Sequence, residues 1–436
     1  MKVSSKFNLL HFVKNLTLTE IAGSIGDLGT LLPIMIALTK NNSISLTYSL
    51  IFGGLYNIYT GFYYDIPVCV QPLRLVNLSF EKMKSIAAIA IANNFSMPEV
   101  AASGILVSAI VLILGITQTI TFVYKYIPLP IIRGIQLGTG LRLITQGVTV
   151  ITSSNKWIFS NFYWSDNYLI AIISALICFL FYNAKKNFSA LILFLFGLTV
   201  GLVKIYLIKD VKDKNLTIPS VGLSPPVCQL PLTILNSVIA ISKLADDLFP
   251  FKRRPVVSLT SISVSIGIMN LIGCWFGAMP YCHGSGGLAG QFRFGARTGS
   301  SIIFLGIVKL FCGFLFGNTL LGLLMKFPNS VLGVMLIFAG LELCSVAKDV
   351  GSEYLSYKEN DFEELDEESK KKKNEKYQQS NNNYVIMLST AGTLVGFSND
   401  GIGFLVGCTA SIIFFYEKKF STANINKNDS TNVSDN

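Results

Sequence analysis

The sequence contains few charged residues and almost no histidine. Lys, Arg, Asp and Glu together make up 14% of the 436 residues, and His occurs only twice. Hydrophobic residues make up 51% of the chain, and its mean hydropathy is +0.54. An ordinary soluble domain carries about 25% charged residues. The scarcity of charge therefore excludes that class and predicts a membrane protein with many spans.

Paired cysteines are also lacking. The eight Cys residues occur singly, mostly in apolar surroundings, and no Cys-x-x-Cys motif is present. This spacing indicates neither a disulfide framework nor a metal cluster. Since no grouping of nucleophile, base and metal ligands is present either, we expect no enzymatic activity and no cofactor.

The sequence also lacks the features of a cleaved signal peptide. Residues 1–17 are basic and polar, and the apolar sequence that begins near Leu18 is long enough to span a bilayer. The net charge of +10 is explained by Lys and Arg gathering on the cytoplasmic side of membrane spans, not by nucleic-acid binding. We therefore interpret 1–17 as a cytoplasmic N-terminal tail.

Apolar segments of spanning length recur along the chain. At about 20 residues per span, and fewer for a half-helix, we expect about fourteen segments, seven on each side of a polar external hinge at 209–228. In the first half they are 18–39, 46–65, 66–93, 98–124, 127–150, 167–184 and 188–208. In the second half they are 229–249, 256–277, 278–296, 298–325, 327–348, 384–397 and 400–416.

An odd number of spans in each half gives the two halves opposite orientations. The expected fold is therefore an all-α membrane protein, a seven-plus-seven inverted repeat of 18–208 and 229–418. With the N-terminus in the cytoplasm, positive residues lie on the cytoplasmic side at nearly every loop. An acidic run followed by lysines and asparagines predicts a disordered cytoplasmic loop at 349–383, and an Asn-rich composition predicts a disordered tail at 419–436.

Two similar stretches interrupt the apolar sequence, one in each half. Residues 65–72 read DIPVCVQP, and residues 278–287 read AMPYCHGSGG. Each has a Pro two residues before a Cys and leads into helix-forming residues, so each predicts an extended segment followed by a half-helix. Two such broken spans indicate a substrate site near the middle of the membrane. A weaker match between 125–134 and 326–333, at the start of the fifth span of each half, supports the repeat.

A half-helix that starts inside the bilayer is suited to binding an anion. Its first N–H groups lack partners within the helix, and the helix dipole places positive charge there. Gly284, Gly286 and Gly287 would let an anion approach this backbone closely, and Ser285 and Gln71 would add neutral donors. The alternative is that these glycines only permit tight helix packing.

Four other polar residues lie within expected spans or broken spans. Asp27 is an intramembrane carboxylate that would couple protons or order the site, or else serve as a structural acceptor. Asn236 and Ser237 are expected to contact the substrate. His283 is either a hydrogen-bonded structural residue or a residue that lines the site. The residues expected at span ends, as interfacial or anchoring groups, are Asp246, Asp247, Arg293 and Arg297.

Six motifs resemble those of the molybdate transporter family, a branch of the sulfate permease superfamily. They are GDLGTLLP at 26–33, GLYNIYTG at 54–61, VQP at 70–72, QLPLTILNSVIA at 229–240, CHGSGGLA at 282–289 and FGARTG at 294–299. The resemblance covers nearly the whole membrane region and implies a core domain that moves against a gate domain, with uptake of molybdate, a tetrahedral dianion. The candidate substrate-binding residues are Asp27, Val70, Gln71, Asn236, Ser237, His283, Gly284, Ser285, Gly286 and Gly287.

The chain departs from the family pattern in three places. Ten residues, 73–82, separate the VQP motif from MKSIAA at 83–88, which follows it directly in the family; they are either a true insertion or a retained intron. Gly287 stands where many sulfate permeases have an Arg, so the site would depend on helix dipoles and neutral donors. After the last span no cytoplasmic domain of the sulfate permease type follows, in agreement with the molybdate branch.

Two other functions stay open. A carrier of this fold could transport sulfate, another anion or a nucleobase, although a nucleobase site would be expected to carry a carboxylate where Asn236 and Ser237 stand. Alternatively, the insertion in the first broken span suggests a membrane sensor or scaffold without transport. The expected partners are the anion and the lipid bilayer. The sequence leaves open which membrane holds the protein, and a homodimer is one assembly open to it.

Overall fold

The computed structural model is mostly helical. It describes residues 9–40, 42–73, 96–154, 166–184, 186–207, 233–359 and 367–432. The hinge at 209–228, the first half-helix and nearly all of the insertion at 73–82 lie outside the described residues.

The first half of the chain contains one short strand among its helices. Its elements are α1 (Leu9–Asn15), α2 (Leu18–Ser24), α3 (Leu28–Lys40), α4 (Leu46–Tyr64), β1 (Gln71–Pro72), α6 (Met97–Ile116), α7 (Thr119–Tyr124), α8 (Leu129–Ser154), α9 (Tyr168–Leu180) and α10 (Ser189–Leu207).

The second half contains the other strand, a π-helical segment η2 and two 3-10 segments, η3 and η4. Its elements are η2 (Leu235–Ala240), α12 (Ile241–Leu248), α13 (Leu259–Gly273), η3 (Cys274–Phe276), β2 (Tyr281–Cys282), α14 (Ser285–Arg293), α15 (Gly299–Leu315), η4 (Gly317–Thr319), α16 (Leu320–Leu324), α17 (Asn329–Ser345), α18 (Lys348–Glu359), α19 (Glu367–Gly396) and α20 (Asp400–Asn432).

Five of the described helical segments are long and apolar enough to cross a membrane: 18–40, 97–116, 189–206, 259–276 and 400–417. A sixth is added if α15 and the helical turns after it, which are bent by 105°, count as one span. Two shorter apolar helices are α9 and α17. The apolar helices and the membrane class agree with the prediction from composition.

Helix starts follow capping signals in the sequence. Ser96 and Glu99 form a capping box at α6, and Asn167 caps α9 by accepting from the backbone N–H of Ile170. The two matched segments at 125–134 and 326–333 each open a helix, since α8 begins one residue after Pro128 and α17 one residue after Pro328. Both positions fit the fixed backbone angle of proline, which suits a helix start.

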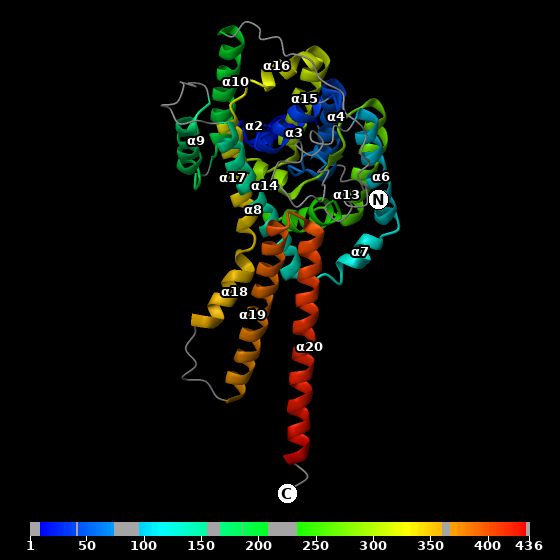
Figure 1. The fold of residues 1–436 in the computed structure, drawn as a ribbon, viewed down its shortest axis with the longest axis vertical. Helices are drawn as coiled ribbons and strands as arrows, with labels where there is room; N and C mark the ends of the chain where they lie inside the picture. Colours follow the sequence, from blue (N-terminus) through cyan, green and yellow to red (C-terminus); the bar gives the residue numbers. More distant parts are fainter. Residues whose placement is uncertain are drawn as a thin grey trace.

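Two regions expected to be disordered, 349–383 and 419–436, are helical wherever the structure describes them, which corrects the prediction for 349–359, 367–383 and 419–432. Helices α18 and α19 cover 348–359 and 367–396, and α20 continues to Asn432. Glu and Lys have high helix propensity, and extending a helix is far easier than starting one. Because α19 and α20 each have an apolar half packed in the bundle, their polar halves continue the same helices. In Figure 1 these helices extend from one end of the bundle.

Several expected spans are interrupted. The first is divided at 25–27 into α2 and α3, and the fourth is divided into α6 and α7 by a break at Gln118, which has a positive φ of 58°. The span expected at 229–249 contains the π-helical segment η2. Hydropathy reports length and apolarity, and it does not detect a local change in the hydrogen-bond pattern.

Glycines set the closest helix crossings. Helix α4 packs on α15, and α8 packs on α17. At both crossings glycines of the two helices face each other, so that a Cβ on Gly306 would lie 2.6 Å from the Gly54 carbonyl oxygen and a Cβ on Gly340 would lie 2.6 Å from the Gly140 carbonyl oxygen. Small residues let helix backbones approach where lipid offers no hydrophobic driving force.

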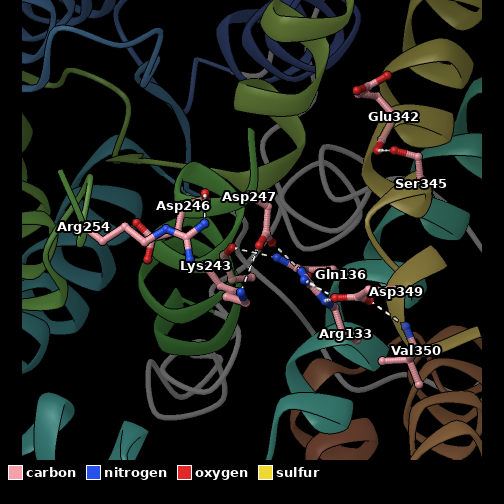
Figure 2. A network of polar contacts seen from close by, with 11 residues as sticks. Arg133, Gln136, Lys243, Asp246, Asp247, Arg254, Glu342, Ser345, Asp349 and Val350 are labelled. Carbon is pink, nitrogen blue, oxygen red and sulfur yellow. Dashed lines mark hydrogen bonds and ion pairs between the residues drawn. The ribbon is translucent and has the colours of Figure 1, made fainter. Parts of the chain in front are cut away.

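A buried arginine joins three helices at one end of the bundle (Figure 2). Arg133 of α8 forms ion pairs of 2.5 Å with Asp247 of α12 and with Asp349 of α18. Lys243 also pairs with Asp247, at 2.9 Å. Asp247 is therefore part of an interhelical ion network, whereas Asp246 accepts from the backbone N–H of Val256 at 2.8 Å.

The contact between glycines of α4 and α15 predicts that two matched substitutions change the stability of the protein differently. Gly306→Ala should destabilise the protein by about 1–3 kcal/mol, because its Cβ would overlap backbone of α4. Gly322→Ala, where nothing lies within 4 Å of an added Cβ, should be neutral or stabilising by up to about 1 kcal/mol. Thermal unfolding of the detergent-solubilised protein checks both. Equal melting temperatures for the two variants would contradict the proposed contact.

Candidate functional site

The two interrupted segments meet in the interior and pair as antiparallel strands. Gln71 lies opposite Cys282, and Pro72 lies opposite Tyr281. A further hydrogen bond runs from Leu73 N–H to the Pro280 carbonyl oxygen at 2.7 Å. Both segments are buried. The extended conformation predicted for each segment is confirmed, and their direct pairing is a feature that the sequence did not indicate.

Two buried asparagines hold these strands. Asn57 of α4 accepts from Val70 N–H at 2.8 Å. Asn270 of α13 bonds both backbone groups of Tyr281, with its Nδ2 donating to the carbonyl oxygen and its Oδ1 accepting from N–H, each at 2.6 Å. An amide side chain can replace a neighbouring strand in this way because it carries one acceptor and two donors. These bonds satisfy backbone groups that lipid could not.

Gln71 connects Asp27 to the start of α14. In the amide orientation that satisfies both neighbours, its Nε2 donates to Asp27 Oδ1 at 3.2 Å and its Oε1 accepts from Gly284 N–H at 2.9 Å. Asp27 also accepts from the Thr30 hydroxyl and, at 3.5 Å, from the Cys69 thiol. The carboxylate lies in the break between α2 and α3 and is 4% exposed. Asp27 therefore joins the break between α2 and α3 to the first extended segment through side-chain hydrogen bonds.

The N-terminus of α14 faces these groups. Gly284 is its N-cap residue and provides no side-chain cap. Ser285 donates to Asn236 Oδ1 of η2 at 2.6 Å. A Cβ on Gly287 would lie 2.7 Å from the side-chain amide of Gln71, and one on Gly286 would lie 2.7 Å from Leu143 of α8. These glycines therefore allow both the close packing and the approach to the first segment.

A small polar cavity opens where the segments meet η2. Its volume is about 20 Å³, enough for roughly one water molecule. Of the predicted residues, Gln71, Asn236 and Ser237 line it, while Asp27 and Gly287 lie behind Gln71. The complete lining is Thr30, Ile34, Gln71, Pro72, Leu73, Thr233, Asn236, Ser237 and Cys282.

His283 and Val70 are positioned away from this lining. The His283 ring is fully buried, with Nδ1 donating to the Cys69 carbonyl oxygen at 3.2 Å and Nε2 bonded to Ser265 Oγ at 3.0 Å. Both ring nitrogens are thus used within the protein, which matches the structural role that was one of the two expectations. Val70 contributes its backbone N–H to Asn57.

Lys309 of α15 is a buried cation that the sequence reasoning missed. It is 6% exposed, and its Nζ donates to the Val70 carbonyl oxygen at 3.4 Å. It also lies within electrostatic reach of the Asp27 carboxylate and the Cys69 thiol. A lysine in the apolar run 302–315 was the available signal, since charged residues inside a span are costly and usually functional.

The structural role of Asn57 and Asn270 could also have been inferred from a repeated spacing in the sequence. Gly54 and Asn57 have the spacing of Gly267 and Asn270, and each Asn precedes the proline of its broken segment, Pro67 or Pro280, by ten residues. In the part of the chain that the structure describes, no three His, Cys, Asp or Glu side chains gather as a metal site would require.

In comparisons with known proteins, the matching family and the similar proteins are transporters. The sequence matches the family described as "Molybdate transporter of MFS superfamily" over 19–143 and 223–343. It is 38% identical to Molybdate transporter 2 of Arabidopsis thaliana, over 79% of this chain and 82% of that protein. It is also 38% identical to Molybdate transporter 1 of the same plant, over 77% and 81%.

More distant relatives extend the likeness. Molybdate transporter 1 of Chlamydomonas reinhardtii is 28% identical over 90% of each chain. Among solved structures, the murine Slc26a9 anion transporter in its inward-facing state aligns with a TM-score of 0.55 at 14% identity, covering 95% of this chain and 73% of that one. A second structure of SLC26A9 gives the same TM-score. The fold is therefore of the SLC26 type, although the family description refers to the MFS superfamily.

The Asn270 bonds predict a structural requirement. Asn270→Ala would leave the N–H and C=O of Tyr281 buried without this partner, at a cost of about 1–3 kcal/mol for each group. We expect a lower melting temperature and less monodisperse protein after solubilisation. Asn183→Ala, at an exposed turn, is the matched control and should behave as the unmodified chain. Equal melting temperatures for Asn270→Ala and this control would show that the Asn270 bonds are not needed to hold the strand.

Proposed function

This chain belongs to the molybdate transporter family, and we propose that it carries molybdate across a membrane by alternating access. The anion would bind where the two extended segments meet, against the N-terminus of α14. The observation that carries this proposal is the polar cavity at that junction, lined by Gln71, Asn236 and Ser237. Its lining offers amide and hydroxyl groups, which can surround an oxyanion without holding it irreversibly.

The start of α14 supplies the electrostatic part of the site. A helix of nine residues with no side-chain cap directs its first N–H groups and the positive end of its dipole to that point. Many sulfate permeases have an Arg at the position of Gly287. Here neutral donors and the helix dipole would attract the anion instead. The first half-helix would complete the site from the other side.

Lys309 balances the carboxylate beside the site. An unpaired Asp27 would repel a dianion, whereas a buried lysine within electrostatic reach of it brings the local charge near zero. We propose that Asp27 and Lys309 together determine the net charge beside the bound anion. The bond from Lys309 to the Val70 carbonyl oxygen places the cation directly behind the first segment.

The movement would involve two groups of helices. In one group α4 packs on α15 and α6 packs on α13, and in the other α8 packs on α17. Each of these pairings joins one half of the chain to the other, as an inverted repeat of seven spans per half would require. We propose that the first group is the core domain and the second the gate domain. We place α12, which packs on η2 and α14, with the core domain, so that Arg133 and Asp247 form an ion pair between the two domains.

The cavity must widen to accept the substrate. At about 20 Å³ it has room for roughly one water molecule, whereas molybdate has four oxygen atoms. Separation of the α8 and α17 group from η2 and α14 would enlarge it, because Leu143 of α8 lies against Gly286. A rigid-body movement of this kind is the usual basis of alternating access.

Tracer uptake into vesicles with purified protein tests the function. We expect saturable molybdate uptake that sulfate competes poorly, and no uptake by Gly287→Leu, whose side chain would overlap Gln71 and Cys69. Gly322→Leu, in open space, is the matched control. Loss of uptake in both variants, or in neither, would refute the placement of the site. A chain lacking 73–82, tested in parallel, shows whether the insertion permits transport.

Charge balance predicts the behaviour of Lys309 variants. Lys309→Met should lower uptake at least tenfold, because it removes the buried cation near Asp27, and it should also lower the melting temperature. Adding Asp27→Asn removes both charges and should restore stability without restoring uptake. Measuring melting temperature and uptake for the single and double variants separates the two effects. Normal uptake by Lys309→Met would exclude the lysine from the site.

A further inference from the structure

A second and larger cavity lies at the opposite end of α14. Its volume is about 330 Å³. Three cations and one carboxylate line it, namely Lys186, Arg293, Arg297 and Glu342. The other lining residues are Thr19, Tyr182, Ala184, Asn187, Phe292 and Gly295. The cavity therefore carries an excess of positive charge, in contrast to the neutral lining of the first one.

Arg293 is fixed at this cavity but incompletely neutralised. Its guanidinium lies 3.3 Å from the centre of the Tyr182 ring, and its Nη2 donates to the Tyr182 carbonyl oxygen at 2.9 Å. Its Nη1 reaches Glu342 Oε2 only at 3.4 Å. Strong guanidinium–carboxylate bonds measure about 2.7–2.9 Å. A guanidinium has five N–H donors, so an anion with several oxygens can take the place of Glu342.

Arg297 and Lys186 stand at the rim. The Arg297 guanidinium lies 3.7 Å from the centre of the Phe292 ring and donates to the Ala296 carbonyl oxygen at 2.8 Å. Lys186 is exposed. One carboxylate oxygen of the nearby Glu20, Oε1, accepts from the backbone N–H groups of Arg297 and Thr298, at 2.9 and 3.1 Å.

We propose that this cavity binds a tetrahedral oxyanion, either free or as the phosphate of a lipid head group, between Arg293, Arg297 and Lys186. Binding displaces Glu342 from Arg293. The site is separate from the proposed transport site, and the cavity already exceeds the size of that one. Because Arg293 belongs to α14 and Glu342 to α17, an anion here weakens an ion pair between two helices that the transport cycle must separate.

Titration of the full-length protein in detergent tests the site with molybdate and with inorganic phosphate as probes. Gly287→Leu serves as the background, because its side chain would displace Gln71 and is expected to abolish binding at the transport site. Asn236→Leu, at a residue that lines the first cavity, provides a second background. We expect Arg297→Gln combined with Lys186→Gln to weaken binding about tenfold or more, as loss of charged hydrogen bonds implies. Arg253→Gln, which removes an exposed arginine elsewhere, should leave the affinity unchanged.

Glu342→Gln provides the sharper test. It removes the carboxylate that competes with the anion for Arg293, so binding should become several-fold tighter. In parallel, melting temperatures are compared in phosphatidylcholine vesicles with and without a phosphatidylinositol phosphate. If the lipid raises the melting temperature of the background protein but not of the Arg297→Gln, Lys186→Gln variant, the site binds a lipid phosphate. If the background protein binds the free ions and this variant does not, the site binds a free oxyanion.

Three results would overturn the proposal: neither probe nor lipid has an effect, the double variant binds as the control does, or Glu342→Gln weakens binding. None of these measurements uses transport. A protein that binds here but shows no uptake would therefore refute the proposed function alone, and a protein that transports molybdate without binding here would refute this site alone.

Discussion

Backbone groups inside an apolar membrane must find partners within the protein, and the centre of this molecule is built around that requirement. In the interior of the described chain, the segments around β1 and β2 leave the helical conformation, and unsatisfied N–H and C=O groups there would each cost several kcal/mol. The two extended segments satisfy one another as paired strands, and Asn57 and Asn270 supply further bonds from neighbouring helices. The fold can therefore hold a helix N-terminus in its interior.

That arrangement determines which chemistry is available. Because strand partners and asparagines satisfy the extended backbone, α14 can start in the interior, where Gly284 N–H donates to Gln71 and the Ser285 hydroxyl donates to Asn236. Formal charge lies behind this lining, as Asp27 and Lys309. Under the proposed function, a site of neutral donors with balanced charge behind it would bind an oxyanion weakly enough to release it, as a transporter requires.

The sequence predicted the features that arise from local composition. Pro67 and Pro280, each two residues before a Cys, indicated the extended segments. Gln71, Asn236 and Ser237, which the sequence predicted to contact the substrate, line one cavity, and their contact with the substrate stays a prediction. Features that depend on tertiary contacts were missed. The pairing of Gln71 with Cys282 joins distant halves of the chain, and the π-helical turns around Asn236 depend on packing. The apolar part of α19 was predicted as a span at 384–397, whereas its polar part at 367–383 was missed because composition alone suggested disorder.

The most direct measurement is a crystal structure of the protein with molybdate, recorded at the molybdenum absorption edge. The anomalous signal marks the metal without reference to any assumed site. The account predicts a peak beside Gln71, Asn236 and the first N–H groups of α14, and loss of this peak in Gly287→Leu. A peak confined to another place, including the cavity beside Arg293, would contradict the claim that the anion is held where the two extended segments meet.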